Sequence, residues 1–178
     1  MASMSQKVIG IDPGLADTGI GIVSGKGLKI FNYSYGSIHT DPSTPPPHRL
    51  KEIYLQIQSI LADERPDLII LEDIFSLEKF PRSGIILGKV SGVVLLAAAL
   101  HGVPVQEIPV REAKQVLTGN GRASKLQLER AVRDRLSLSM PIRPDHASDA
   151  LGLAIIGLLR YCNIQNIQIN ESVDQGVE

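Results

Sequence analysis

Two acidic residues follow two short apolar segments of the chain. Asp12 comes directly after Lys7–Ile11, and Glu72 comes directly after Leu68–Leu71. Both runs are typical of buried β-strands, and neighbouring parallel strands of an α/β sheet place their ligands at their carboxyl ends. Two carboxylates that lie so close repel each other unless a cation lies between them. We therefore expect Asp12 and Glu72 to bind a divalent cation such as Mg²⁺ or Mn²⁺.

A further group of candidate ligands lies towards the carboxyl end of the chain. Asp145, His146 and Asp149 begin a mostly apolar helix that we predict over Pro144–Tyr161. At 100° per residue, the three side chains share one side of that helix. A third carboxylate beside Asp12 and Glu72 would allow two cations to be held together.

Each of these residues also has an ordinary structural explanation. Asp12 precedes Pro-Gly and can be a turn residue, while Glu72 can be a surface acid. Asp145 is favoured at a helix start by the helix dipole, and a single histidine such as His146 is more often a packing or capping residue. Asp149 is the hardest to explain in this way, because the residues that follow it are apolar.

The pattern of apolar residues predicts the elements that position these side chains. Helices separate the strands at 7–11, 68–71 and 103–108, so these three strands should be parallel. The first three strands should form an antiparallel meander. We predict an α/β fold with a five-stranded mixed sheet flanked by helices on both faces. The remaining strands are expected at Gly19–Val23 and Leu28–Ile38, and the remaining helices at 50–65, Pro81–His101, Pro109–Leu117 and Ser124–Leu136, the last one capped by Ser124.

Composition limits the class of protein. The chain has 178 residues, of which 43% are hydrophobic, and its mean hydropathy is +0.08, which indicates one globular domain and excludes intrinsic disorder. The single Cys162 excludes an internal disulfide and a cysteine-based zinc site. We expect a domain over 7–162 between a disordered or extra N-terminal segment, 1–6, and a polar C-terminal tail, 163–178.

The longest apolar runs, Val93–Leu100 and Leu151–Leu159, are shorter than the ~20 residues that span a bilayer. The N-terminus does not resemble a signal peptide. We therefore predict a cytoplasmic protein without a membrane partner.

Charge is distributed unevenly along the chain. The net charge is −1, but residues 79–135 carry +6 and the rest of the chain carries −7. A basic half beside an acidic half is expected of an enzyme that binds a polyanion at a carboxylate site. A solvated helical surface is the alternative explanation.

Several short motifs follow one another at specific separations between residue 7 and about residue 162. They are Gly10-Ile11-Asp12-Pro13-Gly14, Thr18-Gly19, Leu71-Glu72 with Phe75, the small-residue helix with Gly88 and Gly92, Lys114-Gln115, Gly119-x-Gly121, Lys125 and Asp149-Ala150-Leu151. Taken in this order, they resemble the RuvC family of Holliday-junction resolvases, which are bacterial nucleases with a ribonuclease-H-like fold.

The resemblance implies a metal-dependent endonuclease that resolves four-way DNA junctions in recombination and repair. It implies two-metal hydrolysis of the phosphodiester, paired symmetric nicks and 5′-phosphate ends. The family's ligand positions fall on Asp12, Glu72, His146 and Asp149, with two Mg²⁺ per subunit or Mn²⁺ in their place. Many members have Asp where this chain has His146, and imidazole suits Mn²⁺ better than Mg²⁺. The sequence leaves open whether His146 or Asp145 completes the metal site.

The same resemblance implies partners. It implies a homodimer, since a junction has near two-fold symmetry, and cooperation with the branch-migration motor formed by RuvA and RuvB. The helix 81–101 is our candidate for the dimer surface, although its small residues can equally serve close packing within the chain. Phe75 is expected against a base near the cut, unless it is a core residue. The predicted DNA contacts are Phe75, Lys89, Lys114, Arg122 and Lys125.

Three other functions fit part of the pattern. Gly10–Gly19 resembles a phosphate loop of actin-like ATPases and sugar kinases, but that fold needs two lobes and this chain has room for one. A related nuclease that acts on structured RNA is the second alternative. A junction-binding protein without catalytic activity is the third.

Overall fold

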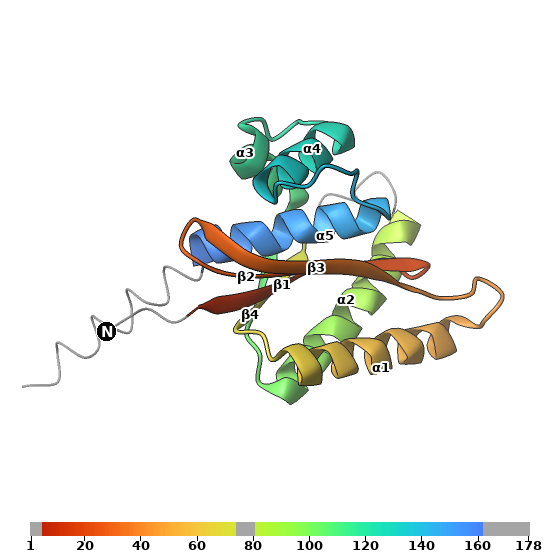
Figure 1. Ribbon diagram of the computed structural model, residues 1–178. Coiled ribbons are helices and arrows are strands. Elements are labelled where there is room, and N and C mark those ends of the chain that lie inside the picture. The colour runs from red at the N-terminus through yellow and green to blue at the C-terminus, as the bar shows by residue number, and fades with distance from the viewer. Residues whose placement is uncertain (1–4, 74–80, 162–178) are drawn as a thin grey trace, which may run out of the picture.

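A five-stranded mixed sheet forms the centre of the computed structural model, which describes residues 5–73 and 81–161 (Figure 1). The strands are β1 (Gln6–Asp12), β2 (Asp17–Lys26), β3 (Lys29–His39), β4 (Leu68–Glu72) and β5 (Val105–Ile108). Their order in the sheet is β3-β2-β1-β4-β5. β1, β4 and β5 are parallel, and β1, β2 and β3 form an antiparallel meander. The predicted mixed sheet is therefore confirmed.

Helices cover both faces of this sheet. The helices are α1 (Pro46–Glu64), α2 (Pro81–His101), α3 (Val110–Thr118), α4 (Lys125–Arg135) and α5 (Asp145–Ile156), which continues as a π-helical turn over Gly157–Tyr161. In Figure 1, α1 and α2 lie below the sheet, α5 lies above it, and α3 and α4 form a further layer on α5. α5 is therefore buried on two sides, which explains its apolar sequence.

The observed bounds differ by a few residues from those expected. Gln6, which we assigned to the N-terminal segment, pairs with Gly25 as the first residue of β1. α1 begins earlier than expected, at Pro46, because proline is well suited to a first helical turn. Residues 1–4, 74–80 and 162–178 lie outside the described residues, so the division at 1–6, 7–162 and 163–178 stays a prediction.

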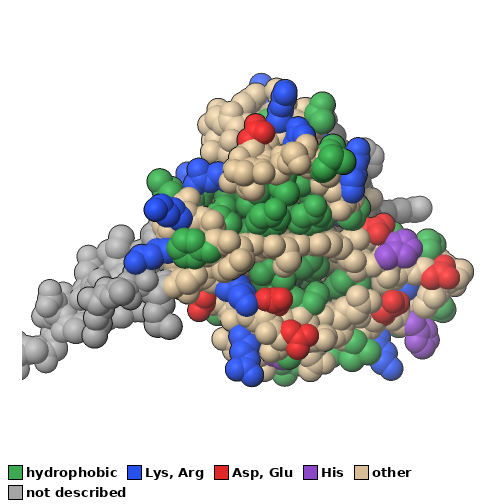
Figure 2. Space-filling model, in the orientation of Figure 1, with side chains coloured by type: hydrophobic (Ala, Val, Ile, Leu, Met, Phe, Trp, Pro, Cys, Tyr) green, Lys and Arg blue, Asp and Glu red, His purple; other side chains and the backbone are tan. Residues whose placement is uncertain are grey.

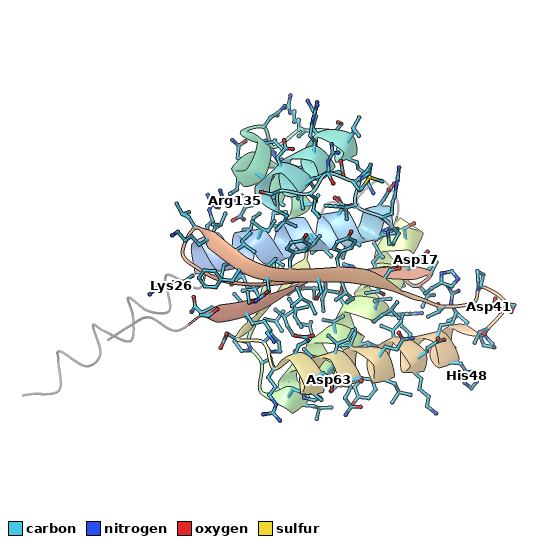
Figure 3. All side chains as sticks on the ribbon, viewed as in Figure 1. Asp17, Lys26, Asp41, His48, Asp63 and Arg135 are labelled. Atoms are coloured by element: carbon cyan, nitrogen blue, oxygen red, sulfur yellow. The ribbon has the colours of Figure 1, made fainter. Side chains whose placement is uncertain are left out.

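Strand alternation decides the direction in which Asp12 and Glu72 point. Val8 and Ile70 belong to the core beneath α5, whereas their neighbours along each strand belong to the core against α1 and α2. Successive side chains of a strand point to opposite faces. Asp12 is four residues after Val8, and Glu72 is two after Ile70, so both point to the α5 face. The register of β1 and β4 places them at the same end of the sheet, the end that Asp17 marks in Figure 3.

Glycines in β1 and β2 let α5 lie directly on the sheet. A Cβ atom on Gly10 would lie 2.0 Å from the carbonyl oxygen of Ala150, and one on Gly19 would lie 2.1 Å from that of His146. Neither position can therefore carry a side chain while the helix stays in place. This close approach brings the first turn of α5 to the carboxyl ends of β1 and β4.

α2 has one face in the core and one face exposed. Its buried residues, Val90, Val94, Ala97 and Ala98, pack in the cluster that includes α1. No atom of the described residues would lie within 4 Å of a Cβ atom on Gly88 or Gly92. The structure thus contradicts close packing within the chain as the reason for these two glycines.

The stretch Ser83–His101 of α2 also corrects the expectation that no apolar segment is long enough to span a bilayer. Within the described ranges, this one stretch is long and apolar enough to cross a membrane by length and composition alone, with a mean hydropathy of 2.0. The expectation was wrong because it counted uninterrupted apolar runs, whereas the average over Ser83–His101 stays apolar even though Gly88, Lys89, Ser91 and Gly92 interrupt it. A core helix of a soluble protein has the same composition, and one face of α2 lies in the core.

The contact between Gly10 and α5 can be tested by adding one methyl group. Gly10→Ala should lower the free energy of unfolding by about 1–3 kcal/mol or more, because the methyl group meets a backbone oxygen that cannot rotate away. Gly36→Ala on β3, where a Cβ has no neighbour within 4 Å, should change it by less than about 0.5 kcal/mol. Urea denaturation measures the free energy of unfolding of both variants. Equal changes in the two variants would contradict the close packing of α5 against Gly10.

Candidate active site

A cleft of about 410 Å³ opens at the carboxyl ends of β1 and β4. Asp12 and Glu72 line it from the sheet, and His146 and Asp149 line it from the first turn of α5. The structure therefore brings together all four side chains that we predicted as metal ligands, although 134 residues of chain separate Asp12 from His146. The loop between β1 and β2 closes one side of the cleft.

Two of these acids are nearly buried and each contacts a basic group. Asp12 is 7% exposed, and its Oδ2 lies 2.7 Å from Nδ1 of His146. Asp149 is 8% exposed, and its Oδ2 lies 3.4 Å from Nζ of Lys125. The cleft thus partly neutralises its own carboxylates with one imidazole and one ammonium group.

The carboxylates perturb one another. Burial raises the pKa of Glu72 to about 9, helped by a hydrogen bond with Asp12 and by the charges of Asp12 and Asp149. Burial also raises the pKa of Asp149, and the charge of Asp12 adds to this effect. The hydrogen bond with Asp12 raises the pKa of His146. Two neighbouring carboxyl groups whose pKa values are both raised, Glu72 and Asp149, are typical of a functional site that would bind a cation.

The donor set fits divalent cations, but the side chains do not stand in ligating positions. Among the described residues, no group of three or more His, Cys, Asp or Glu side chains has the geometry to hold a metal as it stands. The physical reason is that Asp12 and His146 are hydrogen-bonded to each other, and Asp149 faces Lys125. Carboxylate oxygens with an imidazole nitrogen suit Mg²⁺ or Mn²⁺ once these contacts open.

His146 and Asp145, which are adjacent in the sequence, differ in their position relative to the cleft. His146 lines the cleft, whereas Asp145 is not among the residues that line it. The Asp145 side chain is 65% exposed and forms an ion pair with Arg143. His146 is thus the residue of this pair that faces Asp12.

Only some of the predicted DNA-contacting residues lie at the cleft. Lys114 on α3 and Lys125 on α4 line the cleft, whereas Arg122 is exposed between these helices and Lys89 is exposed on α2. Neither Arg122 nor Lys89 belongs to the cleft lining, and Phe75 lies outside the described residues. In Figure 2, several Lys and Arg side chains lie over α3 and α4 at the top of the molecule.

The cap of α4 holds Lys125 at the rim of the cleft. Ser124 Oγ accepts the backbone N–H of Gln127, and the Gln127 side chain accepts the N–H of Ser124. This reciprocal capping box fixes where the helix begins, and the predicted Ser124 cap is confirmed. Lys125 therefore leaves the helix in its first turn, facing Asp149.

Sequence reasoning missed a support for the loop between β1 and β2. Buried Arg49 of α1 donates from Nε to Thr40 Oγ at 2.7 Å, and that hydroxyl donates to the carbonyl oxygen of Leu15 at 2.5 Å. The Thr40 N–H also donates to the carbonyl oxygen of Ala16. These bonds tie the loop to α1. The sequence carries no signal for them, because Arg49 has the appearance of an ordinary cation on an amphipathic helix.

The sheet order, the flanking helices and the clustered carboxylates define a nuclease of ribonuclease-H-like fold. A family model described as "Crossover junction endodeoxyribonuclease RuvC" matches residues 8–157. This chain belongs to the RuvC family, and the predicted resemblance is confirmed. The phosphate-loop reading of Gly10–Gly19 is therefore set aside.

Individual relatives agree with this assignment. The chain is 40% identical to a crossover junction endodeoxyribonuclease RuvC of Brevibacillus brevis over 84% of this chain and 89% of the relative. It is 38% identical to that of Carboxydothermus hydrogenoformans over 86% and 96%. Among solved structures, it resembles "T. thermophilus RuvC in complex with Holliday junction substrate" with a TM-score of 0.82 and 32% identity, over 90% of this chain and 96% of that one.

The contact between Asp12 and His146 predicts a change in titration. Asp12→Asn should lower the pKa of His146 in the metal-free protein, because the hydrogen-bonded carboxylate that stabilises the imidazolium is lost. An NMR titration of the imidazole in the presence of a chelator measures this change. Asp17→Asn, which removes a carboxylate that lines the same cleft but contacts His39, should shift it far less. Equal shifts would mean that general charge, and not this contact, sets the pKa.

Proposed function

We propose that this chain is a homodimeric endonuclease that resolves four-way DNA junctions with paired symmetric nicks, using divalent cations held by Asp12, Glu72, His146 and Asp149. The observation that carries the proposal is the convergence of these four side chains in one cleft. Membership of the RuvC family supports the reaction, and a relative in complex with a Holliday junction supports the substrate.

The cleft residues have complementary roles. Asp12, Glu72 and Asp149 supply carboxylate oxygens for two Mg²⁺ ions, or Mn²⁺ in their place, and His146 supplies a nitrogen. When bound, such ions stabilise the charge of the phosphodiester transition state and lower the pKa of an attacking water. To act as a metal ligand, Glu72 would have to give up the proton that its raised pKa favours. Asp12 Oδ2 and His146 Nδ1 would have to break their hydrogen bond before these two atoms could bind a cation.

The basic residues hold the DNA backbone. Lys125 faces Asp149, and a cation held by Asp149 would leave the Lys125 ammonium group free to contact a DNA phosphate. Lys114, on α3, also lines the cleft. Contacts of this kind provide affinity and salt dependence without reading the base sequence. Cleavage in line then leaves a 5′-phosphate and a 3′-hydroxyl.

The exposed face of α2 is the proposed dimer surface. Ile85, Leu96 and Leu100 are 62%, 55% and 63% exposed, and Gly88 and Gly92 open a flat strip beside them. Small residues spaced four apart let two helices approach closely. A second copy of this chain is the partner we propose, because two matched active sites suit the two-fold symmetry of a junction. A cytoplasmic location and cooperation with RuvA and RuvB complete the proposal.

Removing one carboxylate tests the catalytic site. Asp12→Asn should lower the Mg²⁺-dependent rate of junction cleavage by about 100-fold or more, because a ligand for the cations is lost, while junction binding stays close to that of wild type. Cleavage of a labelled mobile junction and a gel-shift assay measure the two properties. Asp63→Asn, on the exposed surface of α1, should retain the wild-type rate.

Three results would overturn the proposal. An Asp12→Asn variant that cuts like wild type would contradict the site, and faster cutting of a folded RNA than of the junction would contradict the substrate. Junction binding by wild type without any cutting in Mg²⁺ or Mn²⁺ would indicate a binding protein.

A charge on α2 tests the dimer. Leu96→Glu should raise the dimer dissociation constant by about 30-fold or more, because a carboxylate would be buried without a partner at the interface. Analytical ultracentrifugation measures the constant. Leu55→Glu, at a 51% exposed position on α1, should leave it unchanged, and a monomeric wild-type chain would refute the dimer.

A further inference from the structure

The loop between β1 and β2 forms one wall of the catalytic cleft. Gly14, Leu15 and Ala16 of this loop line the cleft beside its carboxylates. Behind the loop stand two threonines, Thr18 and Thr40, which are both buried and do not belong to the cleft lining. The loop backbone therefore lies between these threonines and the place where we expect cations and DNA.

Three successive carbonyl groups of the loop are hydrogen-bonded to the two threonines. Gly14 O accepts the Thr18 hydroxyl at 2.7 Å, and Leu15 O accepts the Thr40 hydroxyl at 2.5 Å. Ala16 O accepts the backbone N–H of Thr40 at 2.9 Å. The loop carbonyls are thus turned towards the protein interior and away from the cleft.

The N–H groups of the loop point in the opposite direction. The C=O and N–H bonds of one planar trans peptide unit are antiparallel, so the N–H of Leu15 is directed opposite to Gly14 O, and the N–H of Ala16 opposite to Leu15 O. Within residues 5–73 and 81–161, neither of these two N–H groups donates a hydrogen bond. Successive backbone N–H groups that converge in a turn are suited to an anion. The cleft therefore has two neutral donors on its loop wall.

Buried Arg49 of α1 fixes the direction of the Thr40 hydroxyl. Arg49 Nε lies 2.7 Å from Thr40 Oγ1. A guanidinium group can donate but not accept, so Thr40 Oγ1 is the acceptor and its single hydrogen stays directed at Leu15 O. Arg49 does not belong to the cleft lining. It therefore acts on the loop through Thr40.

We propose that the N–H groups of Leu15 and Ala16 bind a phosphate oxygen of the cleaved DNA strand, and that Thr40 and Arg49 are positioning residues that keep these donors turned to the cleft. The occupant is an anion, because an N–H group can only donate, and a phosphate is the anion that the proposed substrate brings. Without either positioning residue, the peptide can rotate and present a carbonyl oxygen, which repels a phosphate. The inference rests on the proposed junction-cutting function and adds an uncharged phosphate contact to it.

Hydrogen exchange at the two amides tests the contact directly. NMR measures exchange in the Asp12→Asn variant, alone and with a saturating four-way junction. Bound DNA should slow exchange at Leu15 and Ala16 by about tenfold or more, because a donating N–H must first lose its acceptor. The amide of Gly27, in the turn at the other end of β2, should not change. Unchanged exchange at both loop amides in the complex would overturn the proposal, as would protection by inorganic phosphate without protection by the junction.

Removing the Thr40 hydroxyl tests the positioning role. Thr40→Val keeps the shape of the side chain and should weaken junction binding in a chelator by about tenfold, the loss expected for a hydrogen bond to a charged group. Arg49→Met should weaken binding by a similar factor. The double variant should lose no more than either single variant, because both act on one contact. Thr40→Ser, which retains the hydroxyl, should bind like wild type, and losses that multiply in the double variant would overturn the relay from Arg49.

Salt dependence separates an uncharged contact from a charged one. Thr40→Val should leave the slope of log K against log salt concentration at the wild-type value, because a backbone N–H releases no counterion. Lys114→Met should reduce the magnitude of that slope by about 0.9. A slope that falls equally in both variants would contradict the assignment to backbone donors.

Two control variants on α1 separate positioning from general stability. Lys51→Met removes an exposed cation near Arg49 in the sequence, and Ile57→Val loosens the core without touching Thr40. Both should bind the junction like wild type at a temperature where all variants are folded. Binding by Ile57→Val as weak as that of Thr40→Val would make lost stability the cause and overturn the positioning role.

These assays distinguish the phosphate contact from the proposed function, since none of them needs cutting. If wild type binds the junction without cutting it, and Thr40→Val binds more weakly at an unchanged salt slope, the nuclease function fails and the phosphate contact stands. If wild type cuts and Thr40→Val binds and cuts equally well, the phosphate contact alone is refuted. A wild-type chain that does not bind the junction refutes both.

Discussion

Electrostatic repulsion among Asp12, Glu72 and Asp149 is the constraint on which the rest of this structure depends. Burial of the carboxyl group is the largest cause of the rise in the pKa of Glu72 to about 9, and the hydrogen bond with Asp12 and the charges of Asp12 and Asp149 add to that rise. The free energy that holds these groups together comes from elsewhere in the fold. Apolar residues on both faces of the sheet fill two core clusters, and their burial offsets the cost of the acidic site.

The geometry of the site follows from two simple features of the sheet. Strand alternation and the parallel register direct Asp12 and Glu72 to the same face and the same end. Glycines at positions 10 and 19 then let α5 approach until its first turn meets both strands. Side chains that are far apart in the sequence thus meet in one cleft, because α5 packs directly against the glycine backbone of β1 and β2.

The basic layer of α3 and α4 balances the acidic cleft. Lys125 connects the two, since it pairs with Asp149 and lines the cleft. The capping box at Ser124 fixes the position of Lys125 at the start of α4. A positive charge is therefore held next to the carboxylates of the cleft.

The sequence by itself determined the elements and the acids. The apolar runs that end at Asp12 and Glu72, and the polar turn at the start of an apolar helix, are local patterns, and motif order identified the family. Tertiary structure alone decided that His146, and not Asp145, meets Asp12. Helical periodicity places His146 and Asp145 on the same side of α5, and only the packing of α5 against the sheet determines which of the two side chains reaches Asp12. It also decided that Arg49 supports the active-site loop and that Gly88 and Gly92 face outward. These features depend on contacts between distant segments, which no local pattern of residues encodes.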